Sequence, residues 1–424
     1  MMNQLSRETL CMHAGYTPGN GDPRIMPIVQ STTFKYENAD EVAALFDLSK
    51  EGHMYSRISN PTVEALEKKI AALEGGVAAV ATSSGQAATL LAVLTICNQG
   101  EHIVAFNNLY GGTYTLLTST LKKFGIETTL VPLTASDDEV RKAFQPKTKI
   151  LFGETIGNPG VEVLDIRRAA RLAHEAGVPL FVDNTFATPY LCHPFEHGAD
   201  IIIHSATKFL DGHATSLGGF IVDSGKFNWE NGKFPHLTEE DPNYHGLSYT
   251  KAFGEKAFAV KARAVFLRDF GTTMSPFNAF LINLGTETLH LRMQRHSENA
   301  LAIATALEQN PHVEWVRYPL LPSSPSYDLA KEYLPLGASG IISFGIKGDF
   351  EVSKEFINKL KLASLVVHVG DLRTHVLHPA SMTHRQLSKE AQLRAGISEN
   401  MIRLSVGIEH VQDILKDLEQ ALNP

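Results

Sequence analysis

A lysine and two hydroxyl residues lie close together near the middle of the chain, in the sequence Ser205-Ala206-Thr207-Lys208. The apolar run before them, Ile201-Ile202-Ile203, is typical of a buried strand. A lysine at the end of a buried strand is costly unless it is paired, exposed or covalently bonded. Its amine can condense with an aldehyde, and the two hydroxyls are spaced to hold phosphate oxygens. The segment therefore indicates a ligand with both groups, although a solvated loop lysine is the alternative for this motif alone.

An acid directly follows another apolar run: Asp183 comes after Leu180-Phe181-Val182. A buried carboxylate needs a partner, and the N–H of a pyridinium ring supplies one while the ring stays able to accept electrons. Pyridoxal 5'-phosphate (PLP) combines this ring with an aldehyde and a phosphate. The alternative is an Asp183 that caps a helix or pairs with an arginine.

Two further segments follow predicted strands and suit the same ligand. Ser84-Gly85-Gln86 opens a predicted helix, where backbone N–H groups and a hydroxyl bind phosphate well. Tyr110, followed by Gly111-Gly112, offers a ring for stacking, and the glycines allow a flat ligand to approach the backbone. Taken singly, the first segment favours an ordinary capped helix start, and the alternative for the second is a turn with a core tyrosine. Together with Lys208 and Asp183 they favour PLP.

The elements that position these residues alternate between strand and helix. Apolar strands are predicted at 77–81, 102–106, 127–133, 149–152 and 179–182, with helical segments between them. Strands that are apolar throughout indicate a mostly parallel sheet covered on both faces, which is an α/β fold. Such sheets bind ligands at the carboxyl ends of their strands, where the candidate residues fall. No dinucleotide fingerprint or P-loop motif is present.

Composition narrows the choice of partners and compartment. The net charge of −8 over 424 residues, without a basic run, argues against nucleic acid or a membrane surface as the main partner. The three cysteines are scattered, so we expect neither a disulfide framework nor a zinc site. No apolar leader or membrane span is recognisable, and a cytoplasmic location is expected. His375, His378 and His384 lack a metal-binding spacing, so no metal is predicted.

The chain resembles the Cys/Met metabolism family of fold-type I PLP-dependent enzymes, which includes sulfhydrylases, cystathionine synthases and γ-lyases. The resemblance covers nearly the full length. It is carried by Tyr55-Ser56-Arg57, Ser84-Gly85, Tyr110-Gly111-Gly112-Thr113, Asn158-Pro159, Val182-Asp183-Asn184-Thr185, Ser205-Ala206-Thr207-Lys208, the segment from His378 to His384, and Arg403-Leu404-Ser405-Val406-Gly407.

The resemblance implies a role for each matching residue. Lys208 is expected to carry PLP and move protons, with Asp183 on the ring nitrogen. Tyr110 is expected to stack on the ring and assist proton transfer. Arg403 is expected to bind the substrate α-carboxylate, with His368 and Tyr55 nearby. Asn158 is expected to contact the ring hydroxyl. The residues expected to bind the phosphate are Ser84, Gly85, Gln86, Ser205 and Thr207. Tyr55 and Arg57 are expected to bind the phosphate of a neighbouring subunit.

The same resemblance implies three parts of the chain. Residues 1–60 are expected to form an arm that contacts a neighbouring subunit, 61–275 the PLP-binding domain, and 276–424 a smaller C-terminal α+β domain. A polar stretch at about 224–249 is too long for a routine connection and is similar to an insertion of the sulfhydrylase branch. In the C-terminal domain, strands are expected at 340–345 and 362–369.

The expected reaction is a γ-replacement, in which sulfide displaces acetate from O-acetyl-L-homoserine and gives L-homocysteine. Gly112 stands where methionine γ-lyases usually have a cysteine, whereas His368 and Gln86 depart from the usual sulfhydrylase residues. Cystathionine γ-synthase and the γ-lyases of the family therefore stay open as alternatives, as does a regulatory PLP-binding protein. A homotetramer built as a dimer of dimers is expected, and the sulfur arrives either as free sulfide or from a carrier protein.

Overall fold

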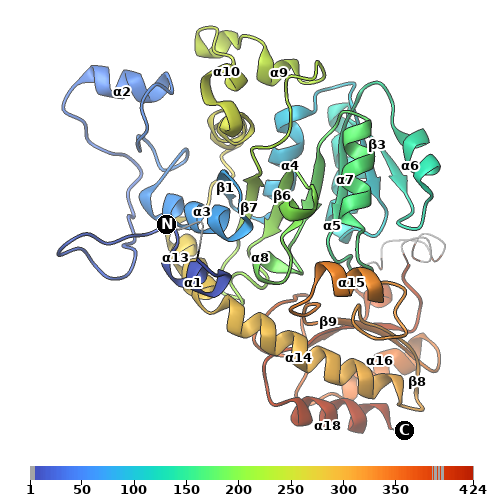
Figure 1. The fold of residues 1–424 in the computed structure, drawn as a ribbon. Helices are drawn as coiled ribbons and strands as arrows, with labels where there is room; N and C mark the ends of the chain where they lie inside the picture. Colours follow the sequence, from blue (N-terminus) through green and yellow to red (C-terminus); the bar gives the residue numbers. More distant parts are fainter. Residues whose placement is uncertain (1–4, 384, 386–388, 390–391, 393–395, 424) are drawn as a thin grey trace.

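The larger of two β-sheets organises the molecule (Figure 1). The computed structural model describes residues 5–383, 385, 389, 392 and 396–423. Seven strands form this sheet in the order β1-β7-β6-β5-β4-β2-β3, and only β7 runs antiparallel to its neighbours. The mostly parallel sheet predicted from the sequence is thus confirmed. The strands are β1 (Ala78–Thr82), β2 (His102–Phe106), β3 (Glu127–Val131), β4 (Thr148–Glu154), β5 (Leu180–Asp183), β6 (Ile201–Ser205) and β7 (Gly219–Asp223).

Successive residues of the central strands enter different hydrophobic cores. Phe181 packs with Ile201 and Ile203 on one face, whereas Val182 packs with Ile202 on the other. This is why these strands are apolar throughout. The first face is covered by α4 (Gly85–Ile96), by the helical stretch 111–124, which begins with α5 (Gly111–Thr115), and by α11 (Ala257–Lys261). The second is covered by α3 (Pro61–Glu74), α6 (Asp137–Ala143) and α7 (Ile166–Glu175).

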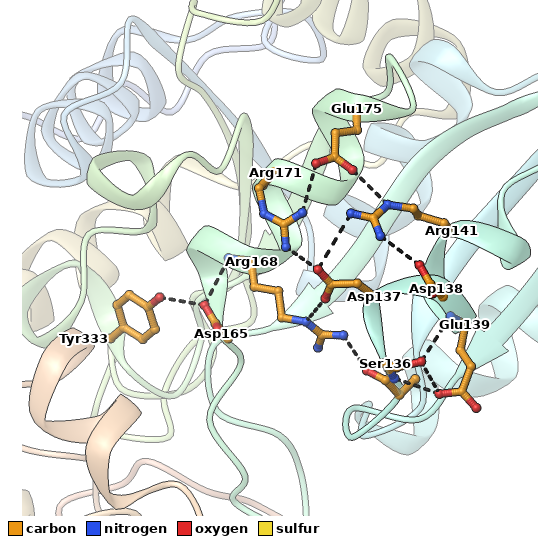
Figure 2. A network of polar contacts seen from close by, with 11 residues as sticks. Ser136, Asp137, Asp138, Glu139, Arg141, Asp165, Arg168, Arg171, Glu175 and Tyr333 are labelled. Carbon is orange, nitrogen blue, oxygen red and sulfur yellow. Dashed lines mark hydrogen bonds and ion pairs between the residues drawn. The ribbon is translucent and has the colours of Figure 1, made fainter.

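Helix α7 begins where the sequence predicts, because the Asp165 side chain accepts the N–H of Arg168 at 3.0 Å. The same carboxylate accepts the Tyr333 hydroxyl at 2.8 Å, which joins α7 to α15 (Tyr327–Tyr333). Figure 2 shows the neighbouring ion pairs, in which Asp137 of α6 holds Arg168 at 2.6 Å and Arg171 at 2.5 Å. Hydrogen bonds from these arginines lower the pKa of Asp137 to about 2. The network ties α6 and α7 together along the edge of the sheet.

The stretch after β7 is an ordered aromatic layer. Trp229 stacks on Phe258 of α11 with ring centroids 5.4 Å apart and meets Phe234 edge-on at 5.1 Å. Trp229 is 4% exposed and Phe234 is fully buried. The insertion thus extends the hydrophobic core on one face of the large sheet. Its helices are α9 (Pro235–Thr238) and a short turn at Pro242–Tyr244, and α10 (Tyr249–Phe253) follows.

The second sheet belongs to the C-terminal α+β part, in the order β10-β11-β12-β9-β8. Its strands are β8 (Val313–Arg317), β9 (Ile341–Ile346), β10 (Ser364–Leu365), β11 (His375–Leu377) and β12 (Met401–Ser405). The helices around it are α14 (Leu289–Glu308), α15, α16 (Phe350–Lys359) and α18 (Val411–Leu422). The strand expected at 362–369 is mostly wrong, since only two of its residues pair. Its apolar residues Leu365, Val366 and Val367 lie exposed at the sheet edge.

The N-terminal region contains two short helices that the sequence analysis did not predict. Helix α1 (Arg7–His13) packs on the body through Leu10 and Cys11, whereas α2 (Ala39–Phe46) projects from it (Figure 1). The other α-helices of the described ranges are α8 (Thr188–Leu191), α12 (Arg268–Phe270) and α13 (Pro276–Glu287).

Candidate active site

A cavity of about 230 Å³ lies at the carboxyl ends of the parallel strands. It receives side chains that follow β1, β2, β4, β5 and β6, together with Arg403 from β12 of the smaller sheet. The structure brings together all but two of the residues singled out from the sequence. Those lining the cavity are Ser84, Gly85, Gln86, Tyr110, Asn158, Asp183, Ser205, Thr207, Lys208, His368 and Arg403.

Lys208 follows β6 and its ammonium donates to His368 Nδ1 at 3.3 Å. Burial, with a smaller contribution from the charge of Arg403, lowers the pKa of Lys208 to about 8. Burial and the neighbouring Lys208 lower the pKa of His368 to about 4, so this imidazole is neutral and accepts the bond. The lysine therefore reaches its nucleophilic, neutral form far more easily than a solvated one.

Asp183 ends β5 and lies in the cavity wall, where its carboxylate accepts the N–H of Thr185 at 2.9 Å. Burial raises its pKa, while the bonds from Thr185 and the charge of His204 oppose that rise. Among the residues that the structure describes, no lysine or arginine forms an ion pair with it. A buried acid in this position suits a cationic ring nitrogen.

The residues predicted to bind phosphate surround the start of α4. The Ser84 hydroxyl caps the helix by accepting the N–H of Ala87 at 3.2 Å. A Cβ at Gly85 would lie 2.6 Å from Cβ of Ser205, so only glycine lets β6 come this close. The Thr207 hydroxyl lies beside Gly218, accepting its N–H at 3.1 Å. Helix N–H groups and two serine hydroxyls thus converge on one corner of the cavity.

Arg403 reaches the cavity from the smaller sheet. Its guanidinium donates to Asn158 Oδ1 at 3.1 Å and to the backbone carbonyl of His368 at 3.3 Å. Burial lowers the pKa of Arg403 to about 10, which leaves it charged at neutral pH. These contacts place the guanidinium and the amine of Lys208 in the same cavity.

Tyr110 forms another wall, with its ring half-exposed. A Cβ at position 112 would lie 2.5 Å from the Tyr110 ring and 3.2 Å from Nε2 of Gln86. Gly112 is therefore what permits this placement of Tyr110 and Gln86. A cysteine here would displace both.

Tyr55 and Arg57 do not line the cavity of their own chain. Both are exposed on the N-terminal arm, where Arg57 lies over the Tyr55 ring at 5.4 Å and donates to the carbonyl of Arg268. A single chain therefore leaves these two candidates outside the site.

The cavity also contains an acid that the sequence analysis missed. Glu154, at the end of β4, is 5% exposed and its carboxylate accepts the N–H of Tyr110 at 2.7 Å. The missed apolar wall includes Ile156, Phe186, Leu217, Val367 and Val369. Only the parallel register, which pairs Glu154 with Asp183, reveals that this acid belongs to the cavity. No comparable signal points to the loop residues Leu217 and Val367.

No group of three or more His, Cys, Asp or Glu side chains is arranged to hold a metal in the part of the chain that the structure describes. His384 lies outside the described residues. All three cysteines are free and buried. No helix among the described ranges is long and apolar enough to cross a membrane.

The chemistry of the cavity matches PLP group by group. The lysine amine has no carboxylate partner among the described residues and is free to bond an aldehyde. Asp183 suits the ring nitrogen, and the start of α4 suits the phosphate.

Comparisons with known proteins agree with this match. The profile described as Cys/Met metabolism PLP-dependent enzyme matches residues 8–423. The O-acetyl-L-homoserine sulfhydrylase of Leptospira meyeri is 48% identical, covering 100% of this chain and 98% of the relative. O-acetyl-L-homoserine sulfhydrylase 1 of Thermus thermophilus is 47% identical, covering 98% and 99%.

A solved structure shares the fold. The crystal structure of a putative O-acetylhomoserine (thiol)-lyase from Campylobacter jejuni, which carries N'-pyridoxyl-lysine-5'-monophosphate, superposes with a TM-score of 0.96. It is 36% identical, and the match covers 99% of this chain and 100% of that one. The fold-type I architecture and the PLP cofactor predicted from the sequence are thus confirmed. The chain belongs to the family of Cys/Met metabolism PLP-dependent enzymes.

Proposed function

We propose that the protein is an O-acetyl-L-homoserine sulfhydrylase, which replaces the acetate of its substrate with sulfide and gives L-homocysteine. The observation that carries the proposal is a single cavity that contains both Lys208 and Arg403. An amine that bonds PLP and a guanidinium that binds a carboxylate are the two requirements for an α-amino-acid substrate. The names of the relatives at 47–48% identity support the choice of ester and sulfide.

The cofactor contacts are proposed residue by residue. Lys208 would hold the aldehyde of PLP and, as a free amine, would move the proton at Cα of the substrate. When bound, PLP draws electrons from the substrate into its protonated ring, and Asp183 keeps the ring nitrogen protonated. Tyr110 stacks on the ring, and Asn158 contacts the ring hydroxyl. The phosphate is bound by Ser84, Gly85, Gln86, Ser205 and Thr207.

The substrate end of the cavity is assigned to Arg403 and His368. Arg403 forms a bidentate pair with the α-carboxylate. His368, as a neutral imidazole beside Lys208, lies within reach of the same group. Leu217 and Val367 give the cavity an apolar wall suited to the methylenes of the substrate.

We also propose a homotetramer assembled from dimers, in which the arm, residues 1–60, completes the neighbour's site through Tyr55 and Arg57. The exposure of both side chains outside their own cavity supports this arrangement. Residues 61–275 form the PLP-binding domain and 276–424 the C-terminal domain. The three free cysteines support a reducing compartment, the cytoplasm.

The proposal is tested with purified, PLP-loaded protein given O-acetyl-L-homoserine and sulfide, while acetate and homocysteine are both quantified. Equal amounts of the two products are expected. Lys208→Ala removes the cofactor bond and is expected to abolish turnover in a protein that still folds. A regulatory PLP-binding protein would form neither product even with Lys208 intact.

The same assay separates the related reactions. With cysteine in place of sulfide, efficient formation of cystathionine would reassign the protein to cystathionine γ-synthase. Succinyl and phosphoryl esters of homoserine measure ester preference. A carrier protein that holds sulfur as a thiocarboxylate, substituted for sulfide, tests whether free sulfide is the donor.

A further inference from the structure

Glu154 is a buried acid of the cavity that has no role in the proposed binding of PLP or substrate. Its Oε1 accepts the N–H of Tyr110 at 2.7 Å, and its carboxyl also accepts the N–H of Asn158. One side chain thereby joins the loop after β2 to the loop after β4. These loops carry the two residues proposed to contact the ring of PLP.

A second acid lies on the neighbouring strand. Glu154 and Asp183 are register partners on the parallel strands β4 and β5, so both side chains leave the sheet on the same face. Both line the cavity. Among the described residues, no lysine or arginine forms an ion pair with either of them. Two neighbouring buried carboxylates without a cation repel each other, and one of them therefore keeps its proton.

The surroundings decide which acid is neutral. Asp183 accepts bonds from Thr185, and the charge of His204 on β6 favours its ionised form. Glu154 also accepts N–H groups, which oppose the rise of its pKa, but it lacks a cationic neighbour of this kind. Burial, followed by the charge of Asp183, raises its pKa well above the ordinary range. The cavity cations Lys208 and Arg403 donate instead to His368 and Asn158.

We propose that Glu154 is a positioning residue: a neutral carboxylic acid that fixes the loops bearing Tyr110 and Asn158 and leaves Asp183 as the carboxylate for the ring nitrogen of PLP. Glu154 acts through these neighbours and contacts no reacting atom. The inference rests on the proposed function only for the presence of PLP, and is independent of which ester or nucleophile the enzyme uses.

The protonation state is measured on the PLP-loaded protein by infrared spectroscopy at about pH 8.5. Burial raises the pKa of Asp223 to about 7, so this acid is mostly ionised at that pH. The difference spectrum between the wild type and Glu154→Gln is expected to contain the carbonyl band of one protonated carboxylic acid. Its absence from the difference spectrum would overturn the proposal.

The Kd for PLP tests whether Glu154 acts through its hydrogen bonds or through a negative charge. Glu154→Gln keeps an oxygen acceptor for both N–H groups, so its Kd for PLP is expected to stay within about threefold of the wild type. Glu154→Ala leaves both N–H groups without their partner and is expected to weaken PLP binding about tenfold. Equal losses in the two variants would contradict the proposal. If Glu154→Ala fails to fold, the infrared result and the Kd of Glu154→Gln for PLP still test the proposal.

Glu67 provides a matched control. It is also buried and accepts a backbone N–H, that of Ala81, at 2.7 Å, but Arg263 holds its carboxylate at 2.8 Å. Glu67→Gln is expected to leave both the infrared band and the Kd for PLP unchanged. Loss of the band in Glu67→Gln would show that the proton belongs to Glu67 and would contradict the proposal.

Discussion

Lys208 holds an amine whose reactivity is set by its surroundings. Burial and Arg403 lower its pKa from the ordinary value of 10.5 to about 8, and His368 accepts its hydrogen bond. Lys208 and Asp183 were predictable because each follows a run of apolar strand residues, where an unpartnered charge is unfavourable. Glu154 was not, because Gly153 separates it from the apolar run at 149–152, and only the register with Asp183 places it beside that acid.

The lowered pKa of Lys208 predicts how the cofactor-free protein bonds PLP. Only the neutral amine attacks an aldehyde, and its fraction increases as the pH rises through the pKa. The rate of covalent bonding, followed by absorbance, is expected to increase with pH and to reach half its maximum near pH 8. A midpoint near 10.5 would mean that Lys208 is solvated. Lys208→Ala is the control and is expected to show no bonding.

The proposed role of Arg403 predicts how a substitution changes the KM for the substrate. Arg403→Lys keeps the charge but loses the planar fork that pairs with a carboxylate. We expect KM for O-acetyl-L-homoserine to increase roughly 10- to 100-fold, as the loss of one charge-assisted hydrogen bond implies. Steady-state kinetics measure this change, with the Kd for PLP as the control. An unchanged KM would remove Arg403 from the carboxylate site.

At the scale of elements, the parallel strands and their helices could be predicted from apolar runs and from caps such as Asp165. Helix α13 was missed although Ser275-Pro276 is a helix start, with serine as the cap and proline at the first position. The expected strand at 362–369 was wrong because an apolar run does not reveal whether it is buried. Val367 lines the cavity mouth instead of a core.

The insertion makes a prediction about stability. Trp229 is buried between Phe258 and Phe234. Trp229→Ala leaves a large cavity and is expected to destabilise the protein by about 3–5 kcal/mol. Urea unfolding followed by circular dichroism measures the loss. Trp315→Phe, at a less buried position, is expected to cost less, and equal costs would contradict a core role for the insertion.

At the scale of the whole molecule, we propose that one chain does not complete the site. Helix α2 of the arm projects from the body (Figure 1), and Tyr55 and Arg57 lie outside the cavity of their own chain. No sequence pattern within one chain shows which subunit such residues serve. The resemblance to the family supplied that expectation, and experiment has to test it.

Subunit mixing tests whether the arm acts on the neighbouring subunit. Arg57→Ala and Lys208→Ala are each expected to be nearly inactive. In a mixed dimer, the site with an intact Lys208 receives an intact arm from its partner, so co-refolded mixtures are expected to regain up to about a quarter of wild-type activity, because half the dimers then hold one of two sites. No recovery, with mixed dimers verified by mass spectrometry, would place the arm on its own subunit.

The partition of products from O-acetyl-L-homoserine as sulfide is withdrawn tests the γ-replacement reaction most directly. We propose that PLP is carried on Lys208, and a replacement reaction needs its nucleophile to release a sulfur-containing product. We predict homocysteine in proportion to acetate when sulfide is present, and little 2-oxobutanoate or ammonia when it is absent. Rapid formation of 2-oxobutanoate and ammonia that sulfide does not change would contradict the account and identify an eliminating lyase.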